Sequence, residues 1–356
     1  MRVVICWISI SGYLAACWRA LAERDGIDLR LVVFPSLGTA DAPFRADLSA
    51  GLPVDLLEEN YTDDVDHVAG LVAAHAPQIV VIPGWVVPAF RALASHPALR
   101  GAKFILTMDT PRRDNWRQKF TRLKLGRFLD RMDRIVVPGE RSWQYARQLR
   151  FPEFKIRRGM YGVDFSRWHG LHERRRAHGG GWPRRFLFAG RYVSVKGIDV
   201  LLRAYSIYRG EHPDAWPLTC CGSGPMSGQV KSAGEGVEDL GFVQPQDQAE
   251  VWMKSGVFVL ASRFDPWPLV IVEACASGLP ILCTEACGSS VELVRSHYNG
   301  ITVATDNAES LARGMSSFHD RYEQLPVMGR RSQELAGAFS AETWAERWMQ
   351  MFLELV

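Results

Sequence analysis

Residues 257–283 read VFVLASRFDPWPLVIVEACASGLPILC, and this stretch decides the fold. It contains an apolar run at 257–260, a polar loop, a helical pattern over 269–277 and a second apolar run at 281–283. Gly278 directly after the helical pattern, with Pro280 beyond it, is typical of a helix end. The order strand, helix, strand predicts two parallel strands joined by a crossover helix.

The same alternation extends through the rest of the chain. Strands that are apolar throughout belong to parallel sheets covered by helices on both faces. We therefore expect an α/β protein with two Rossmann-like, doubly wound domains that face a central cleft, with ligands at the carboxyl ends of the strands. The further apolar runs lie at 2–8, 29–34, 79–82, 104–107, 135–137, 186–189 and 218–221.

A change in composition separates the two halves. Residues 166–183 are rich in Arg, His and Gly and show no apolar period, which predicts a solvated linker. We accordingly place an N-terminal domain at 1–165 and a C-terminal domain at 184–339. The last helical segment, about 340–356, is expected to pack back on the N-terminal domain, and a helix of the C-terminal domain is the alternative.

Composition excludes several classes of protein. The 356 residues are 47% hydrophobic and 23% charged, as in soluble globular proteins, and the net charge of +3 gives no general sign of nucleic-acid binding. We expect no nucleic-acid partner. The seven cysteines are odd in number and lack CxxC spacing, so reduced, buried thiols are favoured over a disulfide framework or a zinc site.

The N-terminus allows two interpretations. The apolar run 2–8 could open a signal peptide, and Cys17 could mark a lipoprotein cleavage site. Ser9 and Gly12 interrupt that run, however, and the helical pattern that follows continues directly into the strand at 29–34. This arrangement favours a first buried strand and a cytoplasmic protein.

Two carboxylates in the quoted stretch are candidates for chemistry. Asp265 lies in the loop after a buried strand, and Glu273 lies one turn into the next helix. The amides that begin a helix have no internal partners and can bind an anion. A carboxylate on each side of such a phosphate site suits a sugar nucleotide. The alternative is that Asp265 caps the helix and Glu273 is an ordinary helical residue.

Two further loops join a strand to a helix. Gly190 begins a loop that carries Arg191 and Lys196, two cations at the carboxyl edge of a strand, where a diphosphate needs its charge neutralised. The loop at 222–225 is rich in glycine but lacks the full dinucleotide fingerprint. Taken alone, each loop is also compatible with ordinary surface.

In combination, these elements resemble a known family. The order of Gly190-Arg191 and Lys196-Gly197, Gly222-Ser223-Gly224-Pro225, 240–243, the Asp265 and Glu273 pair, and 274–280 resembles the C-terminal half of family 4 retaining glycosyltransferases of the GT-B fold. Gly162-Val163-Asp164 also resembles the segment that precedes the linker in that family. The N-terminal domain shares only the architecture.

The resemblance implies roles for individual residues. Arg191 and Lys196 would hold the donor diphosphate and stabilise the departing nucleotide, and Asp265 would lie near the donor sugar. Glu273 would bind the ribose hydroxyls. The remaining residues implied to contact the donor are Gly12, Gly190, Gly222, Gly224, Phe242, Val243, Trp267, Pro268, Leu269 and Val270.

The chain also departs from the family pattern. Asp265 replaces the commoner glutamate, and Pro268 has no N–H to offer a phosphate. Gly12 stands alone where many members have a glycine pair. No histidine follows the strand at 104–107; Asp109 is there instead, either as its replacement near the reacting sugar or as a strand-end turn residue.

The activity implied by the resemblance is retaining transfer of a sugar from a UDP-, GDP-, ADP- or dTDP-sugar to a hydroxyl acceptor, a glycan or a lipid-linked sugar, in polysaccharide or glycolipid assembly. No DxD motif stands at a suitable strand end, and the family chemistry is independent of metal, so we expect neither a metal nor a cofactor. A non-catalytic sugar-nucleotide-binding subunit and a nucleotide-sugar epimerase of the same fold are the alternatives.

Residues 112–128 form a basic segment. Seven Arg or Lys residues stand against one acid, Asp114, and alternate with Trp116, Phe120, Leu123 and other apolar residues. A basic amphipathic helix can lie on an anionic membrane or attract an anionic acceptor. The alternative is a solvated helix whose apolar side is part of the core.

Overall fold

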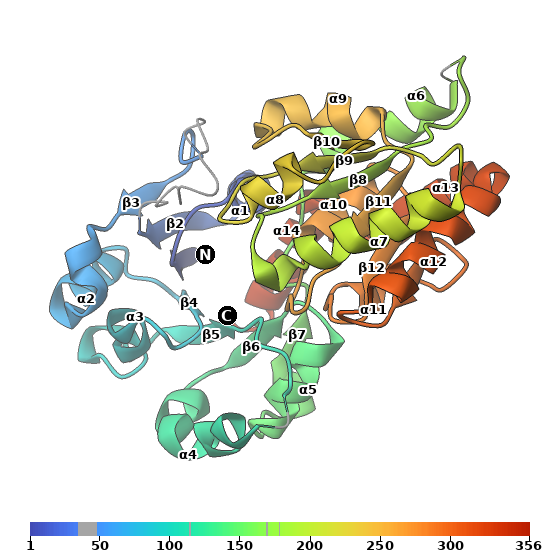
Figure 1. Cartoon of the computed structure of the whole chain (residues 1–356). Coiled ribbons are helices and arrows are strands. Elements are labelled where there is room, and N and C mark those ends of the chain that lie inside the picture. The colour runs from blue at the N-terminus through green and yellow to red at the C-terminus, as the bar shows by residue number, and fades with distance from the viewer. Residues whose placement is uncertain (35–47, 114, 169, 178) are drawn as a thin grey trace. The chain divides into compact units, whose positions relative to one another are not determined.

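The computed structural model describes residues 1–34, 48–113, 115–168, 170–177 and 179–356. The described chain forms two compact units (Figure 1). The first contains the residues up to Asp164 together with Phe339–Val356, and the second contains Phe165–Ala338. Each unit is built on one parallel sheet flanked by helices, so the predicted fold class is confirmed.

The first unit has a seven-stranded sheet in the order β3-β2-β1-β4-β5-β6-β7. Chain order reverses between β1 and β4, and at such a switch point the loops leaving the two strands diverge and make room for a ligand. The strands are β1 (Arg2–Trp7), β2 (Asp28–Val33), β3 (Val54–Leu56), β4 (Ile79–Pro83), β5 (Lys103–Thr107), β6 (Arg134–Val137) and β7 (Ile156–Arg158).

Alternate side chains of β1 enter two hydrophobic layers. Val4 and Cys6 enter the layer under α2 (Val65–Ala74), α3 (Pro88–Leu93), α4 (Trp116–Asp130) and α5 (Glu140–Gln148). Val3 and Ile5 enter the layer under α1 (Gly12–Ala22) and α14 (Ala341–Leu353). The N-terminal residues thus form a central strand of the sheet, as the pattern favoured.

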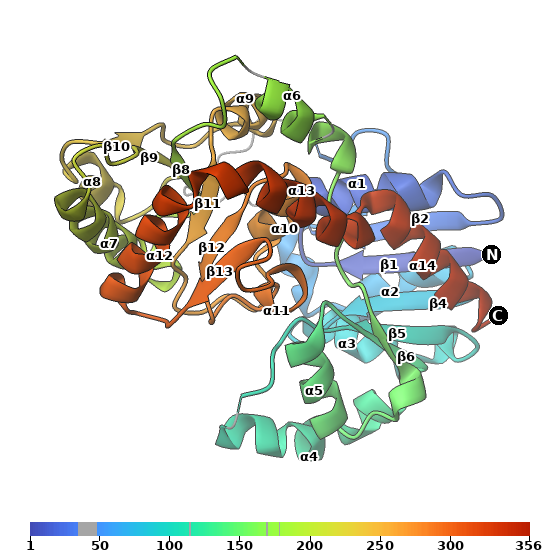
Figure 2. The ribbon, with the colours of Figure 1, turned by 90° about the vertical axis from the view of Figure 1, so that its right-hand side faces the viewer.

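Helix α14 runs beside α1 in the first unit (Figure 2). The indole N–H of Trp344 donates to the carbonyl of Met160 at 2.9 Å, and that of Trp348 donates to the carbonyl of Gly159 at 3.1 Å. Both indoles are buried. These contacts fix the last helix to the segment that leaves the first sheet.

The second unit has a six-stranded sheet in the order β10-β9-β8-β11-β12-β13, which reverses between β8 and β11. Its strands are β8 (Phe186–Ala189), β9 (Leu218–Cys221), β10 (Val237–Asp239), β11 (Val257–Leu260), β12 (Ile281–Thr284) and β13 (Gly300–Val303). Its helices are α6 (Leu171–Ala177), α7 (Ile198–Glu211), α8 (Ser227–Lys231), α9 (Gln248–Met253), α10 (Leu269–Ala276), α11 (Ser290–Leu293), α12 (Ala308–Asp320) and α13 (Leu325–Ala336).

The solvated linker predicted at 166–183 is wrong for much of that stretch. A short 3-10 helix (Phe165–Trp168) and α6 occupy it, and Trp168, His172 and Arg175 are buried. The Arg175 guanidinium donates to the carbonyls of Ser277 at 3.0 Å and Trp252 at 2.9 Å. A buried arginine that satisfies carbonyl groups cannot be told from a surface arginine by its position in a charged run.

Two other features bear on earlier expectations. All seven cysteines are buried and free, as expected for reduced thiols. None of the helices in the described residues is both long enough and apolar enough to cross a membrane.

Candidate functional site

Most of the predicted donor residues gather around one cavity of the second unit. It has a volume of about 330 Å³ and opens at the last residues of β8, β9 and β11, at the switch point of the sheet. Ligand pockets typically measure about 300–1,000 Å³. The predicted residues that line it are Gly190, Arg191, Lys196, Gly222, Phe242, Val243, Asp265, Trp267, Pro268, Leu269, Val270 and Glu273.

Two glycines let the loops of this cavity approach one another. Gly197 has φ +66°, and a Cβ there would lie 1.9 Å from the carbonyl oxygen of Ala261. A Cβ on Gly222 would lie 1.9 Å from the carbonyl oxygen of Gly190. A larger residue at either position would therefore push the loop that carries Arg191 and Lys196 away from the neighbouring segments.

Lys196 and Asp265 form an ion pair inside the cavity. The Lys196 ammonium donates to Asp265 Oδ2, and the two side chains are 18% and 9% exposed. Arg191, by contrast, is exposed and makes no ion pair with any described residue. The two predicted cations therefore differ in the unliganded site, because one is neutralised within the protein and the other is open to an incoming anion.

Arg263 braces the loop that carries Lys196, and sequence reasoning missed it. Its guanidinium donates to both carboxylate oxygens of Asp199 at 2.8 Å and to the Ser194 carbonyl at 2.6 Å. It also donates to Asp306 at 2.9 Å. This pairing holds the pKa of Asp199 below its ordinary value. A bidentate pair fixes geometry as well as charge.

Glu273 places a carboxyl group on the cavity wall. Burial raises its pKa to about 7, and the positive charge of Arg167 opposes that rise. No described residue hydrogen-bonds to its side chain. Arg167 itself donates to Gln248 Oε1 at 3.1 Å, and Gln248 also lines the cavity. A carboxyl group held in this way has free oxygens to offer to a ligand.

Helix α10 directs its N-terminus at the cavity. Its first residues, Leu269 and Val270, line the wall, and no side chain caps the helix, because Pro268 occupies the N-cap position. The first amides of a helix have no partner within it and carry the positive end of its dipole. The Pro268 carbonyl accepts a hydrogen bond from Ser289 at 3.0 Å, which fixes the turn.

Apolar side chains complete the wall. Phe242 and Val243 were predicted from the sequence. Val251 and Trp252 of α9, which were not predicted, line the cavity as well. The turn before Phe242 is held by Asp239, which accepts from the Gly241 amide at 2.9 Å and from the Tyr192 hydroxyl at 2.8 Å. The cavity therefore combines a flat apolar surface with fixed charges.

Three predicted residues lie away from this cavity. Gly224 belongs to the second unit but does not line the wall, and Gly12 begins α1 in the first unit. Asp109 lines a separate pocket of about 220 Å³ at the switch point of the first sheet, together with Trp7, Trp85 and Tyr161. The Tyr161 hydroxyl donates to Asp109 Oδ2 at 3.1 Å.

One group of the described residues has the composition of a metal site. His212, Asp214 and His319 bring their ligand atoms within 4.8 Å of one another beside α7 and α12. The two imidazoles are stacked, with centroids 4.4 Å apart and planes 26° apart. Nitrogens of stacked rings do not converge on one ion, because a metal lies close to the plane of each imidazole that binds it.

Solved structures share this architecture. The structure of HepE from Anabaena in complex with UDP and glucose matches with a TM-score of 0.74 at 14% identity, over 99% of this chain and 100% of HepE. The two Rossmann-like units therefore have the GT-B fold of glycosyltransferases.

Within that class, residues 183–320 match the family model described as Glycosyl transferases group 1. An uncharacterised glycosyltransferase of Haemophilus influenzae is 27% identical over 46% of this chain and 48% of its own length. A D-inositol 3-phosphate glycosyltransferase of Streptomyces coelicolor is 30% identical over 45% of this chain and 38% of its own length. The chain thus spans less than half the length of these curated relatives.

Proposed function

We propose that the protein transfers a sugar from a nucleoside-diphosphate sugar to a hydroxyl acceptor, with retention at the anomeric carbon. The observation that carries the proposal is the single cavity that collects Arg191, the Lys196–Asp265 pair, Glu273 and the N-terminus of α10. A nucleotide sugar needs cations for its diphosphate, acceptors for its hydroxyls and an apolar surface for its base, and this wall offers all three.

In this proposal the donor diphosphate lies between the cations and the α10 amides. Arg191 and Lys196 offset its negative charge, so that the leaving nucleotide is stabilised by preorganised groups of the protein rather than by a metal ion. Glu273 accepts hydrogen bonds from the ribose hydroxyls, and Phe242 and Val243 cover the base. The donor is a UDP-, GDP-, ADP- or dTDP-sugar, with no cofactor, and UDP is the first nucleotide to test because HepE binds it.

The transfer itself exchanges one glycosidic bond for another. The bond between the anomeric carbon and the diphosphate oxygen breaks, and the acceptor oxygen bonds that carbon from the same face. The acceptor proton passes to the leaving diphosphate, so charge and atoms balance without a protein nucleophile. In this proposal Asp265, which is paired with Lys196, accepts hydrogen bonds from the donor sugar.

For the acceptor we propose the pocket of the first unit that contains Asp109. Trp7 and Trp85 offer it aromatic surface, and the Asp109 carboxylate is oriented by Tyr161. Such a lining suits a sugar ring with its hydroxyls. We take the acceptor to be a glycan or a lipid-linked sugar in polysaccharide or glycolipid assembly. Residues 112–128 would then bring a cytoplasmic protein to the inner face of the membrane.

Screening tests this proposal. Thermal shift with nucleoside diphosphates identifies the base, and hydrolysis of the matching sugar nucleotides identifies the sugar. We expect stabilisation by one base and slow donor hydrolysis that an acceptor sugar accelerates. Stabilisation without turnover of any donor would leave a sugar-nucleotide-binding subunit, and conversion of the donor to its epimer without an acceptor would identify an epimerase.

A further inference from the structure

We propose that a groove beside α4, together with the exposed apolar face of that helix, docks on the phosphate layer of an anionic membrane. The inference rests on the membrane contact in the proposed function. It extends that contact from one helix to a second segment, residues 91–100, and names the lipid phosphates as what the groove binds.

Helix α4 leaves large apolar side chains open. Of its fifteen residues only Gln118 and Leu129 are buried. Trp116, Phe120 and Leu123 are 66%, 50% and 78% exposed. Spacings of four and three residues place these three side chains on one face of a helix. A contiguous exposed apolar face of this kind marks an interaction surface, and tryptophan favours the membrane interface.

The remaining apolar residues of α4 belong to the core. Leu125 and Phe128 are partly buried and pack against the layer under the sheet. The core alternative for the basic segment therefore holds for Leu125 and Phe128, and the membrane hypothesis concerns the exposed side chains of the helix. The exposed side chains are those of Trp116, Phe120 and Leu123, and these are the ones that a partner would cover.

The groove adjoins this face at Leu123. It has a volume of about 1310 Å³ and lies between the second half of α4 and the segment that follows α3. Asp130 is the one acid among the lining residues. It forms an ion pair with Arg122, in which Arg122 Nη2 lies 2.5 Å from Asp130 Oδ1. The lining cations that make no ion pair with a described residue are Arg91, Arg100, Lys124 and Arg127.

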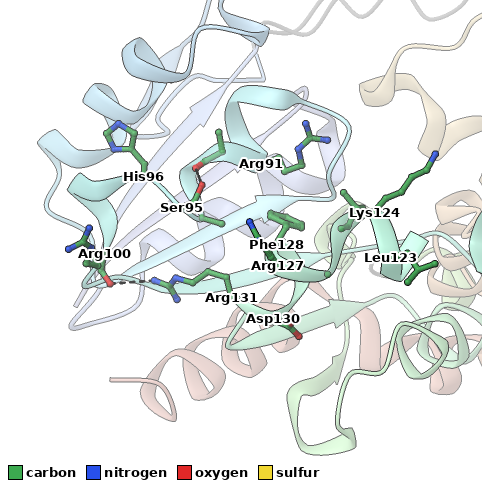
Figure 3. Close-up of a pocket in the computed structure, with 14 residues that line it drawn as sticks. Arg91, Ser95, His96, Arg100, Leu123, Lys124, Arg127, Phe128, Asp130 and Arg131 are labelled. Carbon is green, nitrogen blue, oxygen red and sulfur yellow. Dashed lines mark hydrogen bonds between the residues drawn. The ribbon is translucent and has the colours of Figure 1, made fainter. Parts of the chain in front are cut away.

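The placement of these cations favours a surface over a single small anion. Figure 3 shows Arg91, Arg100 and Lys124 on different sides of the groove rather than directed at one point. These four cations repel one another, and the one acid of the groove is already paired with Arg122, so an external counter-charge stabilises their arrangement. A layer of lipid phosphates supplies many such charges, and its apolar interior accepts Trp116, Phe120 and Leu123.

Vesicle flotation tests the proposal on the full chain. Vesicles of phosphatidylcholine are compared with vesicles that also contain phosphatidylglycerol, at low and at physiological salt. The groove variant combines Arg91→Gln, Arg100→Gln and Lys124→Gln. A charge-matched control combines Lys231→Gln, Lys254→Gln and Arg313→Gln, three exposed cations of the second unit.

We expect binding only when phosphatidylglycerol is present, and weaker binding as salt rises. The groove variant should partition roughly 100-fold less, since each cation near an anionic surface contributes about fivefold. The charge-matched control should keep most of the wild-type partition. Trp116→Ser with Leu123→Ser should also lower it.

Several outcomes would overturn the proposal. One is an intact protein that ignores phosphatidylglycerol vesicles at low salt, and another is an equal loss in the groove variant and its control. Displacement by soluble glycerol 1-phosphate would assign the groove to a free phosphate, and tight binding of a single-stranded oligonucleotide would assign it to a nucleic acid. The UDP-induced thermal shift, measured on every variant, checks folding and reports separately on the donor site.

Discussion

Glu273 is the residue whose environment says most about the donor site. Its carboxyl group makes no hydrogen bond to a described residue, and burial raises its pKa from 4.5 to about 7. Ribose hydroxyls donate best to an ionised carboxylate. At neutral pH, therefore, a large share of the protein carries a proton at Glu273 that binding of the proposed donor would remove.

This gives a pH dependence that can be measured. The affinity for UDP should rise about tenfold between about pH 6 and about pH 8, because the carboxylate form becomes dominant as the pH passes its pKa. Isothermal titration calorimetry at several pH values checks this. Glu273→Gln is the matched control, because glutamine has the same shape as glutamic acid but does not titrate. Any pH dependence that remains in this variant comes from the nucleotide and can be subtracted. An equal pH dependence in both proteins would contradict the assignment.

The same substitution should stabilise the empty protein. The pKa of Glu273 is higher in the folded chain than in the unfolded one, so ionising it costs stability progressively between about pH 4.5 and about pH 7, and the cost is complete above that. Glu273→Gln should raise the free energy of unfolding at about pH 8 by roughly 1–3 kcal/mol. Chemical denaturation at about pH 8 and about pH 4 measures the difference, which should vanish at the lower pH.

Lys196 gives the second residue-scale prediction. Lys196→Ala should reduce transfer by at least about tenfold, the effect of losing one charge-assisted contact of roughly 1.5–3 kcal/mol to the diphosphate. Lys231→Ala removes an exposed lysine of the same unit and should leave the rate unchanged. Initial rates at saturating donor make the comparison. Full activity of Lys196→Ala would mean that the pair with Asp265 is structural only.

At the scale of elements, central strands were readable from sequence and edge strands were not. The strands β1, β4, β5, β8 and β11 are short continuous apolar runs, because neighbours and helices cover them on every side. The strands β7, β10 and β13 lie at sheet edges, have three or four residues and carry polar side chains, so no pattern of useful length remains.

Helix α6 shows a different limit of prediction from the sequence. Its basic composition predicted a solvated linker, yet Arg175 is fully buried and caps the carboxyl ends of α9 and α10. Burial lowers its pKa to about 9, so the guanidinium stays charged at neutral pH and complements the negative ends of both helices. The contact joins residues about a hundred positions apart, and only packing reveals it.

Arg175→Met should therefore destabilise the protein by about 2–4 kcal/mol, because the carbonyl groups of Ser277, Gly278 and Trp252 lose a charged donor in a buried site. Arg174→Met is the control on the same helix, since Arg174 is exposed. Urea denaturation followed by tryptophan fluorescence measures both. A loss below about 0.5 kcal/mol in Arg175→Met would mean that water or neighbouring groups replace the guanidinium.

At the scale of the whole molecule, the candidate site follows from topology. Residues 265–273 were found from sequence because one strand–helix connection carries the carboxylates and the helix N-terminus together. Arg167, Gln248 and Trp252 were missed because they reach the site from separate segments. Arg263 lies in the same connection as Asp265 and was missed because its partner, Asp199, belongs to another segment. The switch point between β8 and β11 is what brings those segments to one edge.

In the proposed donor complex, protein cations lie beside the diphosphate, and this arrangement predicts that transfer is insensitive to chelators. Transfer should keep its rate in excess EDTA, because Arg191, Lys196 and the α10 amides supply the positive charge. Rates before and after dialysis against EDTA make the measurement. Loss of activity that magnesium or manganese restores would contradict a metal-independent mechanism.

The return of the chain to its first unit has a consequence for synthesis. A ribosome releases Phe165–Ala338 as one continuous segment, so the second unit can fold as soon as it emerges. The first unit at that moment still lacks α14, and the side of α1 against which α14 packs is uncovered. Until α14 leaves the ribosome, the first unit is unfinished although its synthesis began earlier, and it is the unit that a chaperone would have to protect.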